Sequence, residues 1–175
     1  SKEVRAKSKS KYSRKKDEKN NEVGLIGEMC VYREIKQLYE DVWWVSGNAE
    51  IAGYTPTGDD AGGYDLKYID ENQEIQYVEV KASTSNRISF HISKNELQFG
   101  CENPKNYEII YVFVNADTTV PPTPYRLGHI FDFPDGESLF ENSHFSIEAE
   151  NFQIYAEFDK NTRVVAQVAP AVRVA

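Results

Sequence analysis

One stretch of alternating residues constrains the fold of this chain more than any other. Residues 62–69 and residues 77–82 each alternate apolar and polar side chains, with β-branched and aromatic residues among them, as half-buried strands do. Only a short polar run separates them, which predicts a β-hairpin. A turn centred on Asn72 pairs residues at equal distances from that centre, so the predicted register places Asp65 opposite Glu79.

This register predicts a site as well as a scaffold. Residues at i and i+2 share one face of a strand, so Glu79 and Lys81 project together beside Asp65. Two carboxylates that face each other across a ladder repel and destabilise the hairpin, whereas a bound divalent cation reverses the sign of that interaction. A solvent-facing ion pair between Glu79 and Lys81 is the alternative. The same Glu-x-Lys pattern recurs at Glu34 and Lys36 in a helical stretch, where two such side chains are about 200° apart and cannot act together.

The charge of the chain is unevenly distributed. The formal net charge is −8 over 175 residues, yet residues 1–20 carry nine Lys or Arg and only three acids. That is an excess of six positive charges, which leaves −14 for the remainder by subtraction. A basic arm beside a metal-binding acidic site is consistent with nucleic-acid binding, and a disordered linker or solvated tail is the alternative.

The composition predicts one folded domain with a sizeable core, because 40% of the residues are hydrophobic and 13% are aromatic. No apolar run has the length of a membrane span, and nothing resembles a secretory signal. We expect Cys30 and Cys101 to be buried thiols, because both lie in apolar helical contexts, and we expect a cytoplasmic protein, because two cysteines do not form a disulfide framework. Neither cysteine has Cys or His neighbours at ligand spacing, so no structural zinc site is expected. The first residue is Ser, and we expect a fragment of a longer protein.

An amphipathic helix is expected before the hairpin, from a cap at Asn20 or Asn21 to about Tyr39. Gly27 lies on its apolar stripe, where the missing side chain allows a close approach to a sheet. Glu28 falls at the edge of the stripe, where its carboxylate either reaches a site at the rim of the sheet or is solvated. The stripe consists of Val23, Ile26, Cys30, Val31, Ile35 and Leu38.

The rest of the chain predicts further strands and one more helix. Ser93 and Glu96 have the spacing of a capping box, which predicts a short helix and gives Glu96 a structural role. Asp59 and Asp60 lie in an expected loop and are either ligands or turn residues. The other expected segments are a strand at 41–46, a loop at 47–63, a short alternating segment at 88–92, a buried central strand at 107–114, a proline-rich end of the core at 118–124, and strand-like pieces at 125–133 and 152–158.

The order of these elements and four short motifs resemble the core of the PD-(D/E)xK nuclease superfamily. Within that superfamily the chain is similar to the DUF3883 family, the domain named for the C-terminus of the plant protein NO VEIN. Ala82 departs from the family's pattern, since a hydroxylated or other polar residue is expected there. The motifs are residues 24–28, 63–65, 78–84 and 90–97, within a likeness that spans residues 22–115.

The resemblance implies the fold of the core. The expected fold is α/β: a restriction-endonuclease-like αβββαβ core with a mixed central sheet flanked by helices, in residues 21–115. The segments outside the likeness are interpreted from their own residues alone: residues 1–20 as a basic disordered or linker arm, and residues 116–175 as a C-terminal β-rich extension of the same domain.

The resemblance also implies a metal-dependent catalytic site. Asp65 and Glu79, with the carbonyl of Val80 and the carboxylate of Glu28, would hold Mg²⁺ or Mn²⁺ through oxygen ligands. Lys81 would position a water molecule or neutralise the charge that develops on the phosphate. The candidates for binding nucleic-acid phosphates, for which an ordinary surface role is the alternative, are Lys67, Arg87 and Lys94.

Three functions are compatible with this sequence. The first is a metal-dependent nuclease that hydrolyses DNA as a module of a larger restriction or DNA-defence protein, joined to a helicase or ATPase and acting singly or as a homodimer. The second is an inactive nucleic-acid-binding or sensing module of the same fold, and the third is a protein-interaction domain. The complete set of Asp65, Glu79 and Lys81 favours the first.

Overall fold

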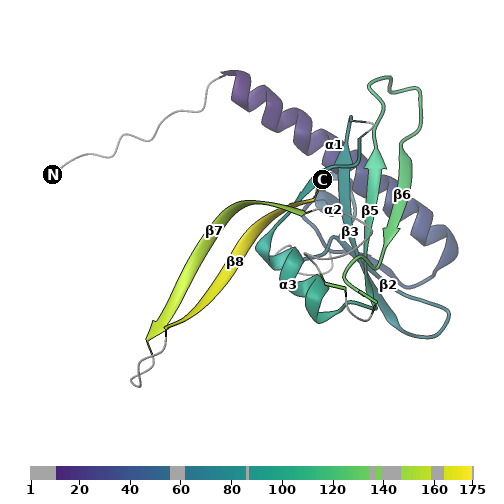
Figure 1. The fold of residues 1–175 in the computed structure, drawn as a ribbon. Helices are drawn as coiled ribbons and strands as arrows, with labels where there is room; N and C mark the ends of the chain where they lie inside the picture. Colours follow the sequence, from purple (N-terminus) through teal and green to yellow (C-terminus); the bar gives the residue numbers. More distant parts are fainter. Residues whose placement is uncertain are drawn as a thin grey trace.

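The computed structural model shows an α/β domain built on one mixed sheet, with a long β-hairpin beside it (Figure 1). It confirms the expected class of a mixed central sheet flanked by helices. The structure describes residues 11–55, 62–85, 87–134, 137–138, 147–158 and 164–174.

The central sheet has five strands in the order β1-β2-β3-β5-β6. The strand β3 lies in the middle, parallel to β5, while the other neighbouring strands are antiparallel. The sheet therefore needs a crossover between β3 and β5, and the segment that carries α3 supplies it. The strands are β1 (Val42–Trp44), β2 (Leu66–Ile69), β3 (Ile75–Ser83), β5 (Tyr107–Phe113) and β6 (Thr123–Gly128).

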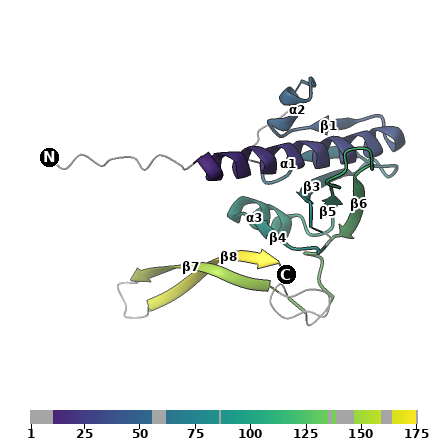
Figure 2. The ribbon, with the colours of Figure 1, turned by 90° about the horizontal axis from the view of Figure 1, so that it is seen from above.

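Helices cover both faces of this sheet. The long helix α1 (Lys11–Leu38) lies on one face, and α3 (Lys94–Glu102) lies on the other together with strand β4 (Phe90–Ile92) (Figure 2). The four-residue helix α2 (Asn48–Ile51) follows β1 where the sequence predicted a loop. The predicted loop residues Asp59 and Asp60 lie outside the described residues.

The start of α1 differs from the prediction. The helix begins at Lys11 and passes through Asn20 and Asn21, so neither residue caps it. Residues 11–19 are rich in Lys, Arg and Glu, which have high helix propensity, and no Gly or Pro interrupts them. The proposed boundary between arm and core at residues 20–21 therefore falls inside one continuous helix.

The end of the sheet also differs from the prediction. The proline-rich segment at residues 118–124 does not end the core, because β6 returns antiparallel to β5, with Thr123 opposite Phe113. A proline is tolerated here because β6 is an edge strand, where one side of the backbone needs no ladder partner. Beyond it, β7 (Ile147–Phe158) and β8 (Val164–Val174) form the long hairpin, and β8 pairs with β4 in a second sheet.

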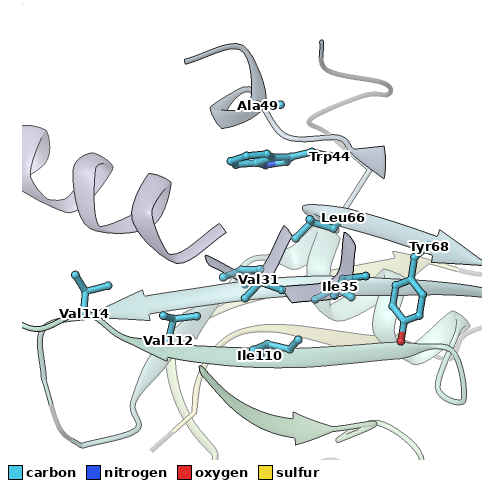
Figure 3. Packing of buried hydrophobic residues seen from close by; sticks show 11 residues of the cluster. Val31, Ile35, Trp44, Ala49, Leu66, Tyr68, Ile110, Val112 and Val114 are labelled. Atoms are coloured by element: carbon cyan, nitrogen blue, oxygen red, sulfur yellow. The ribbon is translucent and has the colours of Figure 1, made fainter. Parts of the chain in front are cut away.

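The apolar core between α1 and the sheet includes most of the predicted stripe. Val31 and Ile35 of α1 are buried against Ile110 and Val112 of β5 (Figure 3). Each such side chain contributes on the order of 1.5–3 kcal/mol through removal from water. Leu38 was predicted to be part of this stripe, but it lies at the end of the helix and is 66% exposed.

The hairpin between β2 and β3 has the predicted register. Leu66 pairs with Val78 and Ile69 pairs with Ile75, as a turn centred on Asn72 requires. The carboxylate of Asp70 accepts hydrogen bonds from the backbone N–H groups of Asn72 and Glu74, both at 2.9 Å, which fixes the turn. The register is thus set by a local polar turn, and it determines which side chains meet at the far end of β2.

Gly27 allows α1 to lie close to the sheet, as predicted. A Cβ atom at this position would lie 2.5 Å from the Cβ of Ala82, whereas one at Gly24 would have no atom within 4 Å. We expect Gly27→Ala to lower the free energy of unfolding by about 1–2 kcal/mol, since overpacking outweighs the gain in helix propensity. Gly24→Ala, the matched control, should raise it by about 0.5–1 kcal/mol. Urea denaturation of both variants measures the difference, and equal stabilisation of the two would contradict this packing.

Candidate acidic site at the end of strand β2

Asp65 is fixed at the point where β2 and β3 separate. Its backbone N–H donates to the carbonyl of Val78 at 2.9 Å, and its carbonyl accepts from Val45 at 2.8 Å. Its carboxylate accepts a hydrogen bond from the backbone N–H of Val80 at 2.8 Å. Gly63, two residues before Asp65, has a φ of +82° and packs on α3, where a Cβ would lie 2.9 Å from the carbonyl oxygen of Asn95. A glycine is therefore required at this turn.

Glu79 and Lys81 project from β3 on the face that α3 covers. Glu79 is 5% exposed, and the Lys81 ammonium lies 2.7 Å from Glu79 Oε1. Val78 and Val80 alternate with them and enter the core on the opposite face. The alternative of a solvent-facing ion pair is thus wrong, because the pair is buried.

Glu96 joins this pair, and the sequence interpretation missed it as a site residue. The capping box was predicted correctly: Ser93 Oγ accepts from the Glu96 backbone N–H, and Glu96 Oε2 accepts from that of Ser93 at 3.1 Å. The same Oε2 atom also lies 2.5 Å from the Lys81 ammonium. The Ser-x-x-Glu spacing explained Glu96 completely, so nothing in the sequence pointed to its second partner.

Glu28 is buried at the edge of the site. Its Oε2 accepts from the Trp44 indole N–H at 2.8 Å and from the Ser46 hydroxyl, and its Oε1 accepts from the Asn48 amide at 2.5 Å. Three neutral donors therefore hold this carboxylate and disperse its charge, one each from β1, the connection after it and the start of α2. These donors were missed because they lie in segments interpreted only as a strand and a loop. The role of Glu28 as a metal ligand stays a prediction.

The carboxyl of Asp65 resists ionisation. Burial raises its pKa well above the ordinary value, and the negative charges of Glu79 and Glu28 raise it further. The Val80 N–H and the Lys81 ammonium act in the opposite direction but do not compensate. A second positive charge beside Asp65 would therefore stabilise the ionised form.

The pKa values of Glu79 and Lys81 are shifted by the same surroundings. Burial raises the pKa of Glu79 to about 8 against the opposing effect of Lys81, and the charge of Glu96 adds to the rise. Burial alone would lower the pKa of Lys81, but the carboxylates of Glu79 and Glu96 outweigh it and raise the value to about 12. Lys81 thus stays protonated at neutral pH, and Glu79 binds a proton more readily than an exposed glutamate does.

A buried tyrosine hydroxyl also lies close to these acidic side chains. Tyr107 is fully buried, and its hydroxyl has no hydrogen-bond partner among the described residues. Burial raises its pKa, and the charges of Glu79, Glu96 and Asp65 raise it further, so the hydroxyl stays neutral. The sequence placed Tyr107 only in a buried strand, since an apolar run does not reveal where a phenol oxygen ends.

The predicted phosphate-binding residues lie outside this network. Lys67 extends over the ring of Trp43, with its ammonium 5.5 Å from the ring centroid, as in a cation–π contact. Arg87 and Lys94 are exposed. The structure therefore brings together Asp65, Glu79 and Lys81, but not the three basic candidates.

The two cysteines, which were predicted to be buried, are more exposed than expected. Cys30 is half-buried, and Cys101 is exposed at the end of α3.

The fit of the site to a divalent cation depends on how many protein ligands that cation needs. Within the described residues, no group of three or more His, Cys, Asp or Glu forms a ready metal centre. Mg²⁺ needs less, because it keeps several waters and binds through one or two carboxylates. Asp65 and Glu79 supply two carboxylates, both with raised pKa values. The carbonyl of Val80 adds a third oxygen, because N–H and C=O of a strand residue point to the same side. These donors fit Mg²⁺ or Mn²⁺ better than zinc.

The fold and these contacts define an α/β domain with a buried acidic site around one lysine. Residues 33–127, a little over half of the chain, match the family described as Protein NO VEIN, C-terminal. The chain therefore belongs to the NO VEIN C-terminal family. The match includes Asp65, Glu79, Lys81 and Glu96, and it begins after Glu28. No curated protein and no solved structure matches the chain significantly.

None of the described helices is both long and apolar enough to cross a bilayer.

The raised pKa of Glu79 predicts how stability depends on pH. Glu79 binds its proton more tightly in the folded protein, so its stabilising contribution is present below pH 4.5 and is lost as pH rises to about 8. Glu79→Gln stays neutral throughout. Relative to the native protein, its free energy of unfolding should therefore rise by on the order of 2 kcal/mol between pH 5 and pH 8.5. Denaturation at both pH values measures this. Glu50→Gln, at an exposed position, is the control and should show no such trend. An equal effect of Glu79→Gln at both pH values would contradict the buried charge.

The orphaned hydroxyl of Tyr107 predicts an unusual response to its removal. Tyr107→Phe keeps the ring contacts with Phe99 and Phe131 and should leave the free energy of unfolding unchanged or raise it by about 1 kcal/mol. Tyr111, on the same strand, donates to the carbonyls of Ser85 and Arg87 at 3.0 and 3.1 Å. Tyr111→Phe should therefore lower the free energy of unfolding by about 1 kcal/mol. Losses of the same size in both variants would show that Tyr107 has a hydrogen-bond partner after all.

Proposed function

We propose that this domain is a metal-dependent nuclease of the PD-(D/E)xK type that hydrolyses phosphodiester bonds of DNA. The observation that carries the proposal is the convergence of Asp65, Glu79 and Lys81 at the start of β2, where Glu79 is buried and the other two side chains are half-buried. A structural role for these groups is unfavourable, because buried carboxylates with raised pKa values reduce the stability of the fold at neutral pH. Membership of the NO VEIN C-terminal family supports the proposal.

Each residue has a role that follows from its position. Asp65 and Glu79, with the Val80 carbonyl, would hold Mg²⁺ or Mn²⁺. Such an ion supplies polarisation of the phosphate ester and lowers the pKa of water. Lys81 is protonated at neutral pH and would donate hydrogen bonds to the negative charge that develops during displacement at phosphorus. Glu28 adds negative charge that favours the cation, from a carboxylate held by Trp44 and its neighbours.

The net charge of the site explains why a cation would be needed for substrate binding. The site contains one ammonium, that of Lys81, and four carboxylates, those of Glu28, Asp65, Glu79 and Glu96, of which Glu79 and Glu96 contact the ammonium directly. A DNA phosphate would be repelled by this arrangement in the absence of a metal. Lys67, Arg87 and Lys94 would contact phosphates farther along the nucleic acid.

The setting of the domain is part of the same proposal. We expect it to act as a module of a larger DNA-defence protein that contains a helicase or ATPase. Cutting both strands of a duplex commonly takes two sites, which a homodimer would supply.

A cleavage assay with matched variants tests the proposed function. Plasmid and single-stranded DNA are incubated with Mg²⁺ or Mn²⁺ and the native protein, Asp65→Asn or Lys81→Met. Each substitution should lower the cleavage rate at least about a hundredfold, because it removes a group that acts on the transition state. Lys105→Met, at an exposed position before β5, is the control and should cleave at the native rate.

Two outcomes would contradict the nuclease. One is cleavage that Asp65→Asn and Lys81→Met leave intact, which would indicate a contaminating enzyme. The other is the absence of cleavage on every substrate by a folded protein, which would leave a nucleic-acid-binding or protein-interaction module. Retention of DNA in a gel-shift assay then separates these two alternatives.

A further inference from the structure

We propose that Glu96 is a positioning residue for Lys81, in addition to its role as the cap of α3. This inference rests on the proposed function, because it assigns Glu96 to the same site. It gives the nuclease a fourth required side chain, which comes from the helix rather than from the hairpin.

The geometry of Lys81 carries the inference. Its ammonium lies between two carboxylates, 2.7 Å from Glu79 Oε1 and 2.5 Å from Glu96 Oε2. The side chains of Lys81, Glu79 and Glu96 are 15%, 7% and 18% exposed, so water has little access to these contacts. Charge-assisted hydrogen bonds with little exposure to water fix a side chain more firmly than surface ion pairs do.

Two partners for one lysine solve a conflict in the site. Glu79 Oε1 holds Lys81 in this structure, yet Glu79 is also proposed to bind the cation. If Glu79 were the only anchor, turning its carboxylate toward a metal would release Lys81. Glu96 removes that dependence, because it keeps the ammonium in place when Glu79 binds elsewhere.

The helix that carries Glu96 is itself firmly attached to the site. The Phe99 ring packs on Tyr64 and Tyr77, with centroid distances of 4.9 Å in both cases. Tyr64 immediately precedes Asp65, so α3 and the acidic turn share one aromatic contact. The Glu96 Oε2 atom is held further by the backbone N–H of Ser93. Glu96 therefore offers Lys81 an acceptor at a fixed position.

Two substitutions separate positioning from capping. Glu96→Gln removes the negative charge beside Lys81 but keeps an accepted capping-box residue, since Gln serves at this position as Glu does. Ser93→Ala removes the hydroxyl of the cap and leaves the Glu96 carboxylate available to Lys81. If Glu96 only caps the helix, Ser93→Ala is the more harmful change, and if it positions Lys81, Glu96→Gln is.

The first readout does not depend on catalysis. Lysine ammonium groups are recorded in ¹H–¹⁵N spectra of the metal-free protein, and Lys81→Met assigns the Lys81 signal. Hydrogen exchange of the Lys81 ammonium with water should be at least severalfold faster in Glu96→Gln than in the native protein, and unchanged in Ser93→Ala. The same exchange rate in all three proteins would overturn the inference.

The second readout is the cleavage rate. Glu96→Gln should lower kcat by on the order of tenfold, with KM for DNA within about a factor of two, whereas Ser93→Ala should keep the native kcat. Equal losses in both variants would show that Glu96 acts through the helix cap alone, which overturns the inference. If the native protein does not cleave DNA, the proposed function fails, and the exchange rates still decide whether Glu96 holds Lys81.

Discussion

The burial of two carboxylates side by side is the constraint on which the rest of this structure depends. Asp65 and Glu79 both ionise less readily than an exposed acid does, because each lies in a poorly hydrated position near the other. One ammonium, that of Lys81, offsets part of this repulsion and is itself held by two acids. The site is thus electrostatically incomplete, with more buried negative than positive charge.

The fold is arranged so that this unfavourable site is tolerated. The Asp70 turn sets the register of β2 and β3 from the opposite end of the hairpin to the acids. On one face of β3, Val78 and Val80 pack under α1, which approaches closely at Gly27. On the other face, α3 brings Glu96 and a set of aromatic rings over the acids. Hydrophobic packing on both faces of the sheet therefore compensates for the repulsion between the two carboxylates.

Local sequence patterns predicted the parts of the structure that local interactions decide. The hairpin register follows from alternation and a polar turn, the capping box from the spacing of Ser93 and Glu96, and the close approach of α1 from Gly27. The pairing of Asp65 with Glu79 and Lys81 followed because a strand places alternate residues on one face. These features need no knowledge of how distant segments pack.

The features that the sequence did not reveal depend on contacts between distant segments. The bond between Glu96 and Lys81 joins a helix to a strand, and the donors to Glu28 come from β1 and α2. The burial of the Tyr107 hydroxyl depends on β5 lying beside β3. A strand-like piece was predicted at residues 125–133, but its place in the central sheet as β6 was missed because the prolines before it were interpreted as the end of the core, although an edge strand accepts proline. The helical start of α1 was missed because Asn20 and Asn21 are strong caps in other settings.

Isothermal titration calorimetry with Mg²⁺ tests the central claim, that Asp65 and Glu79 are buried together to bind a cation. The native protein should bind Mg²⁺ more tightly at pH 8.5 than at pH 6.5, by up to about tenfold per pH unit, because binding displaces a proton from the acid pair. Asp65→Asn should abolish this binding at both pH values. Absence of Mg²⁺ and Mn²⁺ binding to the folded native protein, or binding that neither pH nor Asp65→Asn changes, would contradict the account.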